Sequence, residues 1–237
     1  YAEESADWLK TGRANLLSHL VETFRPRRSV PLTLLEVGAG VGQNLSVLAT
    51  FGAVDAVEVN PLGQRAIAAQ GVVRELFTDP LPFELDRRYD VICALDVIEH
   101  LEDDRQALAW IADRLNPGGV LVATVPAYPW LFSDHDRALH HYRRYTREGF
   151  CAALPGSLSV VTCAYFNHLM FPAAVLSRGA WSLKRMLRPS GSMKQRSPKA
   201  GVVTSLLGGA LSAELALIRK GYLPPWGLSV YCVARRE

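Results

Sequence analysis

The order of apolar and polar positions along the chain predicts a mixed α/β protein that begins with a helix. Between residues 5 and 24, apolar side chains recur at helical spacing, and Pro26 and Pro31 end that pattern. Short apolar runs then alternate with segments of helix length. The runs predict strands at 32–38, 54–60, 72–77, 89–97 and 118–127. Helices are expected near 42–51, 61–69 and 103–115.

Strands that alternate with helices of this length predict a parallel sheet covered on both faces. The run Asn116-Pro117-Gly118-Gly119 predicts a turn that ends one helix and starts the fifth strand. After this strand the alternation becomes irregular. Two further strands are predicted at 157–166 and 227–236, with helix-like apolar and basic sequence between them.

Composition and cysteine usage narrow the class of protein. The 237 residues are 49% hydrophobic and 21% charged, which is enough for one large packed domain. The net charge of +3 is too small to indicate a nucleic-acid partner. No apolar run has the length of a signal peptide or a membrane span, and the four cysteines are scattered without a CxxC pair. We therefore expect reduced cysteines and a cytoplasmic protein.

The charge is distributed unevenly. No Asp or Glu lies between Glu148 and Glu214, whereas seven Lys and Arg residues do. Within that region, 168–199 mixes apolar and basic residues and includes a loop rich in Ser, Pro, Gly and Lys. We favour ordinary packing of a helical cap here. Peripheral contact with the anionic inner face of a membrane is the alternative.

The stretch LLEVGAGVGQNLS, residues 34–46, predicts a cofactor site. A dinucleotide fingerprint requires G-x-G-x-x-G, but Gln43 stands at the third glycine position. Glu36 precedes the glycines, and its carboxylate would repel a pyrophosphate. Glu58 ends the second strand, where an acid can accept both hydroxyls of a ribose. These features favour S-adenosylmethionine, which is cationic and has no phosphate, and they disfavour an NAD-dependent enzyme.

Several further motifs follow in order. With EVGAGVGQNL and Glu58, the runs LPF (81–83), YDVICALDVIEHLED (89–103) and LNPGGVLVATVPA (115–127) resemble the class I S-adenosylmethionine-dependent methyltransferases. The chain is most similar to the type 11 group, which includes ubiquinone-pathway and many small-molecule methyltransferases. The resemblance covers roughly residues 30–150. It implies a Rossmann-like α/β fold, with a seven-stranded, mostly parallel sheet, one antiparallel strand and helices on both faces.

The resemblance also implies how a single methyltransferase domain is divided. Its parts would be an N-terminal helix (1–30), a cofactor-binding core (31–127), an acceptor-site segment (128–156) and a helical cap between the last two strands (167–224).

The cofactor contacts that the resemblance implies are Glu36, Gly38, Gly40, Gly42, Glu58, Asn60, Thr78, Asp79, Leu95, Asp96 and Val97. The first four would shape the methionine end, and Glu58 with Asn60 would hold the ribose. Either Thr78 or Asp79 would bond the adenine amine, although Pro80 departs from the usual pattern there. The product would be S-adenosyl-L-homocysteine.

Glu99 and His100 follow the fourth strand. They could lie near the transferred methyl group, but we favour a structural role in which they brace the start of a helix that Asp103 caps.

The segment SDHDRALHHYRRYTREGF (133–150) would lie over the methyl group in such a fold. Histidine titrates near neutrality and suits a general base, which typically contributes ~10²–10⁴-fold to the rate. We expect His135 and His141 to be the catalytic bases, with Asp136 able to orient one imidazole. The residues expected to contact the acceptor are Asp136, Arg143, Arg144 and Tyr145.

Three other interpretations of this segment stay open. The arginines could pair with surface acids such as Glu148 and Asp134. His135, Asp136, His140 and His141 could hold a metal, but their spacing matches no established signature, so we predict no metal. The segment could instead be a structural lid in which Arg144 is paired internally.

The functional prediction is methyl transfer from S-adenosylmethionine to a small-molecule or lipid-like acceptor, at oxygen and with a histidine base. The alternative is a catalytically inactive cofactor-binding subunit or sensor with the same fold. The sequence does not identify the acceptor or the oligomeric state.

Overall fold

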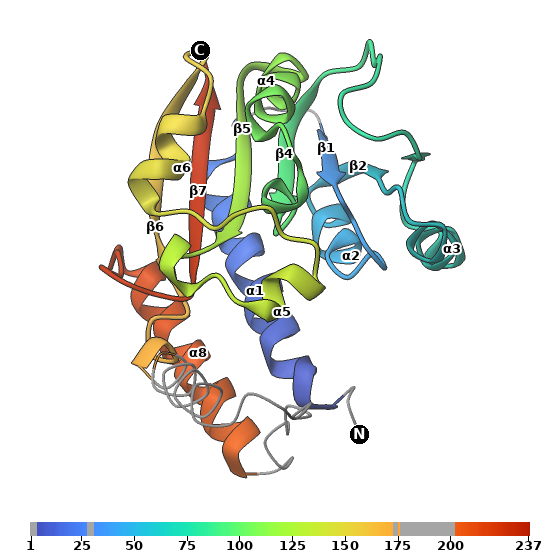
Figure 1. Cartoon of the computed structure of the whole chain (residues 1–237). Coiled ribbons are helices and arrows are strands. Elements are labelled where there is room, and N and C mark those ends of the chain that lie inside the picture. The colour runs from blue at the N-terminus through green and yellow to red at the C-terminus, as the bar shows by residue number, and fades with distance from the viewer. Residues whose placement is uncertain (1–3, 28–30, 173–174, 176–201) are drawn as a thin grey trace.

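The computed structural model describes residues 4–27, 31–172, 175 and 202–237, and its strands form a seven-stranded sheet (Figure 1). The strands are β1 (Leu32–Val37), β2 (Gly52–Val57), β3 (Glu75–Phe77), β4 (Tyr89–Leu95), β5 (Leu115–Pro126), β6 (Leu158–Phe166) and β7 (Ser229–Arg236). Their order across the sheet is β3-β2-β1-β4-β5-β7-β6. The first five pair in parallel, and β7 is antiparallel to both of its neighbours. The predicted Rossmann-like fold with one antiparallel strand is therefore confirmed.

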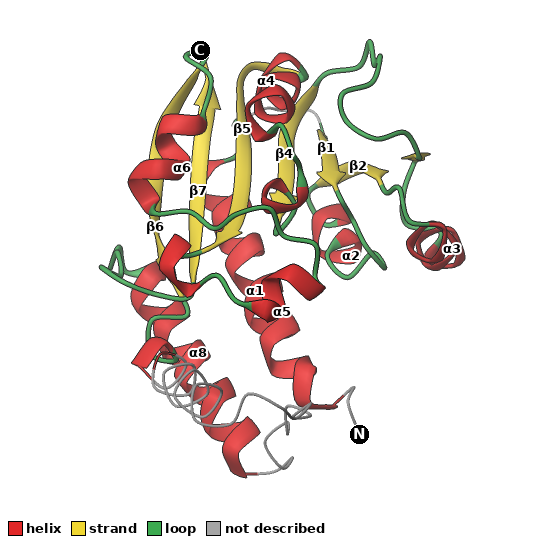
Figure 2. Cartoon of the chain, in the orientation of Figure 1, coloured by secondary structure: helices red, strands yellow, loops and turns green. Residues whose placement is uncertain are grey.

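Helices cover both faces of this sheet (Figure 2). They are α1 (Glu4–Phe24), α2 (Leu45–Ala49), α3 (Pro61–Gln70), α4 (Asp104–Asp113), α5 (Asp134–Ala138), α6 (Arg147–Ala153) and α8 (Val202–Arg219), with short 3₁₀ turns η1 (Ile98–His100) and η2 (Pro129–Leu131). Leu34 packs into a core with α1, α2, α3 and α8, while Leu35 packs into a second core with α4 and α6. Both leucines are fully buried, which explains why β1 reads as a continuous apolar run.

Helix starts follow local capping chemistry. The Asn60 side chain accepts a hydrogen bond from the Leu62 amide, and Pro61 occupies the first turn of α3. The Asp103 carboxylate caps α4 by accepting from the Gln106 amide, as predicted. These caps set where the chain leaves the carboxyl edge of the sheet.

One predicted turn has a different form. Residues 116–119 lie inside β5, where the register passes from Tyr89–Leu115 to Val91–Val120, so that the additional residues bulge out of the ladder. Gly118 at φ 75° permits this bulge. The sequence correctly predicted that residues 116–119 interrupt regular structure. However, β5 already begins before them, because Leu115 pairs with Tyr89 of β4.

Part of the predicted cap can be described. Its C-terminal part is α8, which packs against α1, whereas most of the apolar and basic segment at 168–199 lies outside the described residues. Among the helices that the structure describes, none has both the length and the apolar character needed to cross a membrane.

Candidate functional site

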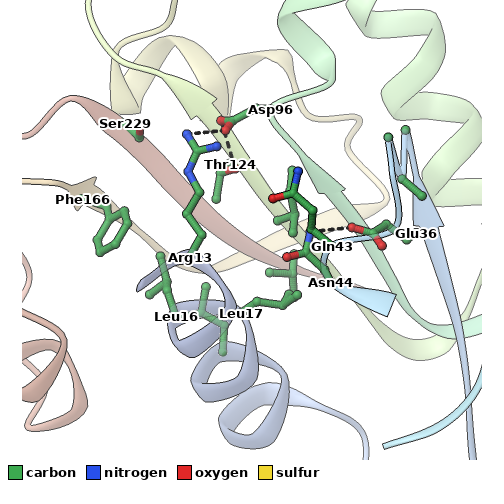
Figure 3. Close-up of a pocket in the computed structure, with 16 residues that line it drawn as sticks. Arg13, Leu16, Leu17, Glu36, Gln43, Asn44, Asp96, Thr124, Phe166 and Ser229 are labelled. Carbon is green, nitrogen blue, oxygen red and sulfur yellow. Dashed lines mark hydrogen bonds and ion pairs between the residues drawn. The ribbon is translucent and has the colours of Figure 1, made fainter. Parts of the chain in front are cut away.

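A pocket lies where β1 and β4 end, between these strands and α1 (Figure 3). Its lining comprises Arg13, Leu16, Leu17, Leu20, Glu36, Gly38, Ala39, Gly40, Gln43, Asn44, Leu95, Asp96, Val122, Thr124, Phe166 and Ser229. The carboxyl ends of the strands in an open parallel sheet form such crevices where the strand order reverses, as it does between β1 and β4.

The glycine turn forms one wall. Gly38, Gly40 and Gly42 have φ of 67°, 57° and 80°, conformations that favour glycine. A Cβ on Gly38 would come within 2.5 Å of Val97 Cγ2, whereas a Cβ on Gly40 would meet no atom within 4 Å. The turn is therefore packed tightly at its base and open at Gly40, where a ligand can approach the backbone.

Glu36 supplies a buried carboxylate to the same wall. It is 1% exposed, and its Oε1 accepts a hydrogen bond of 2.7 Å from Asn44 Nδ2. Its Oε2 is buried without a hydrogen-bond partner. Burial, reinforced by the nearby Glu58 and opposed by Asn44, raises the pKa of Glu36 to about 7. An orphaned carboxylate oxygen in a pocket is suited to a cationic ligand group.

Arg13 lies across the pocket from the glycine turn (Figure 3). Its Nη2 is 2.6 Å from Asp96 Oδ2, and Thr124 Oγ1 donates to Asp96 Oδ1 at 3.2 Å. Asp96 has φ 54°, a left-handed conformation that Asp adopts more readily than most residues other than glycine. The pocket thus presents one guanidinium and two carboxylates, a charge pattern that matches the carboxylate and ammonium of an amino acid.

The predicted ribose and adenine contacts lie outside the pocket lining. Glu58 is 6% exposed; its Oε2 accepts from the Gly40 amide at 2.6 Å and its Oε1 from the Asn60 amide at 2.7 Å. It therefore closes the glycine turn, with a further lone pair on each oxygen. Thr78 and Asp79 are exposed beyond β3. Their roles in binding stay predictions.

In the predicted acceptor segment, the chain is organised around Asp136. This residue is fully buried: its Oδ1 accepts from Arg144 Nε at 2.6 Å, and its Oδ2 from the amide and hydroxyl of Ser133. Although burial opposes ionisation, these donors lower the pKa of Asp136 to about 2. Arg144 also donates to the Ala127 carbonyl, so the pair ties the segment to the end of β5.

Two more residues that were predicted to contact the acceptor, Tyr145 and Arg143, instead contact Asp104 of α4. The Tyr145 hydroxyl donates to Asp104 Oδ2 at 2.6 Å, and Arg143 Nη1 is 3.0 Å from Asp104 Oδ1. Arg143 also donates to the Glu102 carbonyl. All four side chains predicted to bind the acceptor therefore have partners within the protein, an arrangement that suits the structural lid considered above.

The structure separates the two candidate bases. His135 is exposed on α5, whereas the side chain of His141 is 10% exposed and its Nδ1 lies 3.1 Å from Asp136 Oδ1. Asp136 therefore orients His141, not His135. The His141 ring also packs edge-on against His100, with centroids 4.5 Å apart.

Glu99 lies beside these two imidazoles. It is fully buried, and neither carboxylate oxygen has a hydrogen-bond partner. Burial, and then the charge of Asp96, raises the pKa of Glu99 well above its usual range. Donor atoms of Glu99, His100 and His141 lie within 4.8 Å of one another, close enough to hold a cation. Of these three residues, only His141 belongs to the group of possible metal ligands named from the sequence. Asp136, another member of that group, instead accepts hydrogen bonds from Ser133 and Arg144.

Sequence reasoning missed several lining residues, of which Arg13 is the most informative. It precedes Leu16, Leu17 and Leu20 at spacings of three, four and seven, so it lies on the apolar face of α1. A charged residue on that face was the available signal. Thr124, Phe166 and Ser229 come from β5, β6 and β7, and nothing local to them predicts that they meet.

The fold and pocket together define an α/β protein that binds its ligand at the carboxyl edge of a Rossmann-like sheet. The pattern of the methyltransferase domain family matches residues 9–173, and the chain belongs to that family. It is a class I methyltransferase by fold, and the cofactor of that class is S-adenosylmethionine.

Among curated proteins, the chain is similar to the ubiquinone biosynthesis O-methyltransferase of Paramagnetospirillum magneticum, with 35% identity over 38% of this chain and 39% of that protein. The chain matches less than half the length of the curated relatives.

Among solved structures, it resembles the N-methyltransferase NodS of Bradyrhizobium japonicum WM9 in complex with S-adenosyl-l-homocysteine (TM-score 0.54, 16% identity, 96% of this chain and 86% of that one). It also resembles the [4+2]-cyclase SpnF (TM-score 0.56, 17% identity, 94% and 80%). At these identities the likeness is one of fold.

Proposed function

We propose that the protein transfers the methyl group of S-adenosylmethionine to an oxygen of a small-molecule or lipid-like acceptor. The observation that carries the proposal is Glu36, a buried carboxylate with one unpartnered oxygen in a pocket that also presents Arg13. A dinucleotide would bring a pyrophosphate to this turn, and a carboxylate there would repel it.

The pocket fits the amino-acid end of the cofactor. The unpartnered Glu36 oxygen would accept from the ammonium group, and the Arg13 guanidinium would hold the carboxylate after exchanging its contact with Asp96. The open side of Gly40 allows close approach of the ligand to the backbone. Glu58, on the far side of the same turn, would take the ribose hydroxyls through its remaining lone pairs.

For the chemical step, the bound cofactor supplies a methyl group on a sulfonium, which is open to in-line displacement. His141 is the base that the geometry favours, because Asp136 holds Nδ1 and leaves Nε2 to take a proton from the acceptor hydroxyl. Asp136 and Arg144 then act as positioning residues for His141 and the segment that carries it.

Two observations support an apolar acceptor that is methylated at oxygen. The curated relatives are named ubiquinone biosynthesis O-methyltransferases, which favours oxygen and a lipid-like molecule. The Tyr128 ring, just beyond β5, stacks on Tyr165 of β6 and makes tilted contacts with Trp130 and Phe171, and Trp130 is 63% exposed. Such rings offer a surface for an apolar acceptor.

A second candidate keeps cofactor binding but not methyl transfer. It is favoured by the cyclase among the proteins of similar fold, because one fold can host different reactions. The two candidates differ in whether a labelled methyl group leaves the cofactor.

The test is incubation of the full chain with methyl-labelled S-adenosylmethionine and fractionated cell extract, followed by mass spectrometry of the labelled product. We expect one labelled small molecule that dilute alkali does not cleave, as for an ether rather than an ester. Absence of labelled product despite saturable cofactor binding would favour the second candidate.

The base is tested with a matched pair of variants. His141→Asn should lower the methyl-transfer rate by ~10²–10⁴-fold while cofactor affinity is kept, because only the proton-accepting group is lost. His135→Asn, on the exposed side of α5, should retain most of the activity. A larger loss in His135→Asn than in His141→Asn would contradict the assignment. The same assay with a chelator reports whether a cation between Glu99, His100 and His141 assists the step.

A further inference from the structure

Three of the four cysteines meet at one place in the fold, although they are far apart in sequence. Cys151 lies in α6, Cys163 in β6 and Cys232 in β7, and their sulfur atoms all lie within 4.8 Å of one another. Cys163 and Cys232 are direct partners in the antiparallel ladder, and α6 packs against β6 and brings Cys151 to them. All three are free thiols, and we call them the thiol trio.

The chemistry of this donor set is narrow. Three sulfur ligands, with no carboxylate or imidazole among them, select soft or borderline cations rather than Mg²⁺ or Ca²⁺. Sulfurs that share a tetrahedral Zn²⁺ at the usual bond length lie about 3.8 Å apart, so each pair of the trio would close by about 1 Å at most. Rotation of the side chains can supply such a shift.

Access is compatible with a site of this kind. Cys232 is buried at the base, whereas Cys151 and Cys163 are partly exposed. An ion could therefore enter from the side of α6 and keep one position for a water molecule. From these features we propose that the thiol trio binds one thiophilic divalent cation such as Zn²⁺ through three sulfurs, each thiol releasing its proton to solvent as it binds.

The site would be separate from the cofactor pocket. Cys232 belongs to the core shared with α4 and α6, on the opposite face of the sheet from the core that includes α1. No residue of the trio lines the pocket. A bound ion would instead fasten α6 to the edge of the sheet. This helix begins two residues after Tyr145, so the ion would stiffen the end of the segment that carries His141.

The test uses the full chain, reduced and stripped with a chelator, and titrated with Co²⁺ and then Zn²⁺. We expect one Co²⁺ per chain, absorption from sulfur-to-cobalt charge transfer, its loss on addition of Zn²⁺, and a higher melting temperature with Zn²⁺. Cys151→Ser and Cys163→Ser should each weaken binding at least tenfold. Cys93→Ala is the matched control, because Cys93 is buried in β4 away from the trio, and it should bind like the wild type.

Other outcomes would overturn the proposal. Cobalt binding in Cys151→Ser with unchanged affinity and unchanged charge-transfer intensity, or loss of that absorption in Cys93→Ala, would place the ion elsewhere. Absence of binding at equimolar metal, with all three thiols alkylated equally fast with and without Zn²⁺, would mean that the trio is only packed together. A disulfide formed with hydrogen peroxide in a protein that binds no metal would identify an oxidation site instead. Because cofactor binding is measured separately, failure here leaves the proposed methyl transfer untouched.

Discussion

Glu36 and Asp136 are both buried carboxylates, but their surroundings oppose each other. Asp136 is matched by a guanidinium and by donors from Ser133, so it stays ionised inside the protein. Glu36 has a single amide donor and one unpartnered oxygen. A group that is costly to bury and incompletely paired is typical of a binding site, whereas a fully paired one is typical of a structural hub.

The raised pKa of Glu36 predicts how cofactor affinity depends on pH. The carboxylate must ionise to pair with the cofactor ammonium, so affinity should fall as pH drops below about 7. Between pH 7 and 5.5 we expect roughly tenfold weaker binding of S-adenosylhomocysteine by calorimetry. Glu36→Gln, which can still accept from Asn44, should bind more weakly at pH 7 and lose most of this dependence. An unchanged profile in that variant would exclude Glu36 from the ammonium contact.

The stability of the free protein should depend on pH in the opposite direction. Because folding raises the pKa of Glu36 from 4.5 to about 7, its contribution to stability is present below pH 4.5 and is lost as pH rises towards 7. Cofactor binding should therefore stabilise the protein most above neutrality, where Glu36 is ionised and its contribution to the stability of the free protein is lost.

Asp136 makes a separate prediction about stability. Asp136→Asn leaves the buried Arg144 without its carboxylate, and breaking such a pair should cost about 3–5 kcal/mol in the free energy of unfolding, measured with urea. Asp134→Asn, in the exposed pair with Arg137, should cost less than about 1 kcal/mol. Equal losses in both variants would remove the structural role assigned to Asp136.

Among the elements, α1 does more than cover the sheet. It packs Leu16 and Leu20 into the core and carries Arg13 into the pocket on the same face. The helix therefore contributes both to the hydrophobic core and to the lining of the pocket. By contrast, α5 is a five-residue helix whose position is set by the hydrogen bonds of Asp136 and Ser133.

Arg13→Ala tests the contribution of α1. Loss of a charged hydrogen bond to the cofactor carboxylate should weaken S-adenosylhomocysteine binding about 10–100-fold in calorimetry, with little change in melting temperature, because the side chain is 45% exposed. Arg25→Ala, just beyond the same helix and paired with Glu22, should leave affinity unchanged. Equal affinity in wild type and Arg13→Ala would show that α1 does not recognise the ligand.

The elements differ in how far the sequence predicted them. The strands and α3 and α4 were predictable because buried parallel strands read as apolar runs and the helices have local caps at Asn60 and Asp103. The bulge at Gly118 was not, because it depends on how β5 pairs with β4. Internal pairing of Arg144 was one of the interpretations left open, and the structure identifies Asp136 and the Ala127 carbonyl as its partners. The sequence indicated chemistry in the histidine segment but did not show which histidine Asp136 orients.

In the molecule as a whole, the helices on the two faces of the sheet support different parts of the candidate site. The face that carries α1, α2 and α8 builds the pocket from Glu36, Arg13 and the glycine turn. The opposite face carries α4 and α6, which anchor Tyr145 and the segment that presents His141. The pocket and the histidine segment meet near Asp96 and Glu99, at the carboxyl edge of the sheet. Under the proposed function, this arrangement would place the cofactor on one side and His141 on the other.

Calorimetric titration of the full chain with S-adenosylhomocysteine, with NAD as the comparison ligand, tests this account most directly. We predict saturable binding of one S-adenosylhomocysteine per chain with micromolar affinity, strongly weakened in Glu36→Gln, and no binding of NAD. Absence of heat with S-adenosylhomocysteine, or tighter binding of NAD, would contradict the assignment of the pocket.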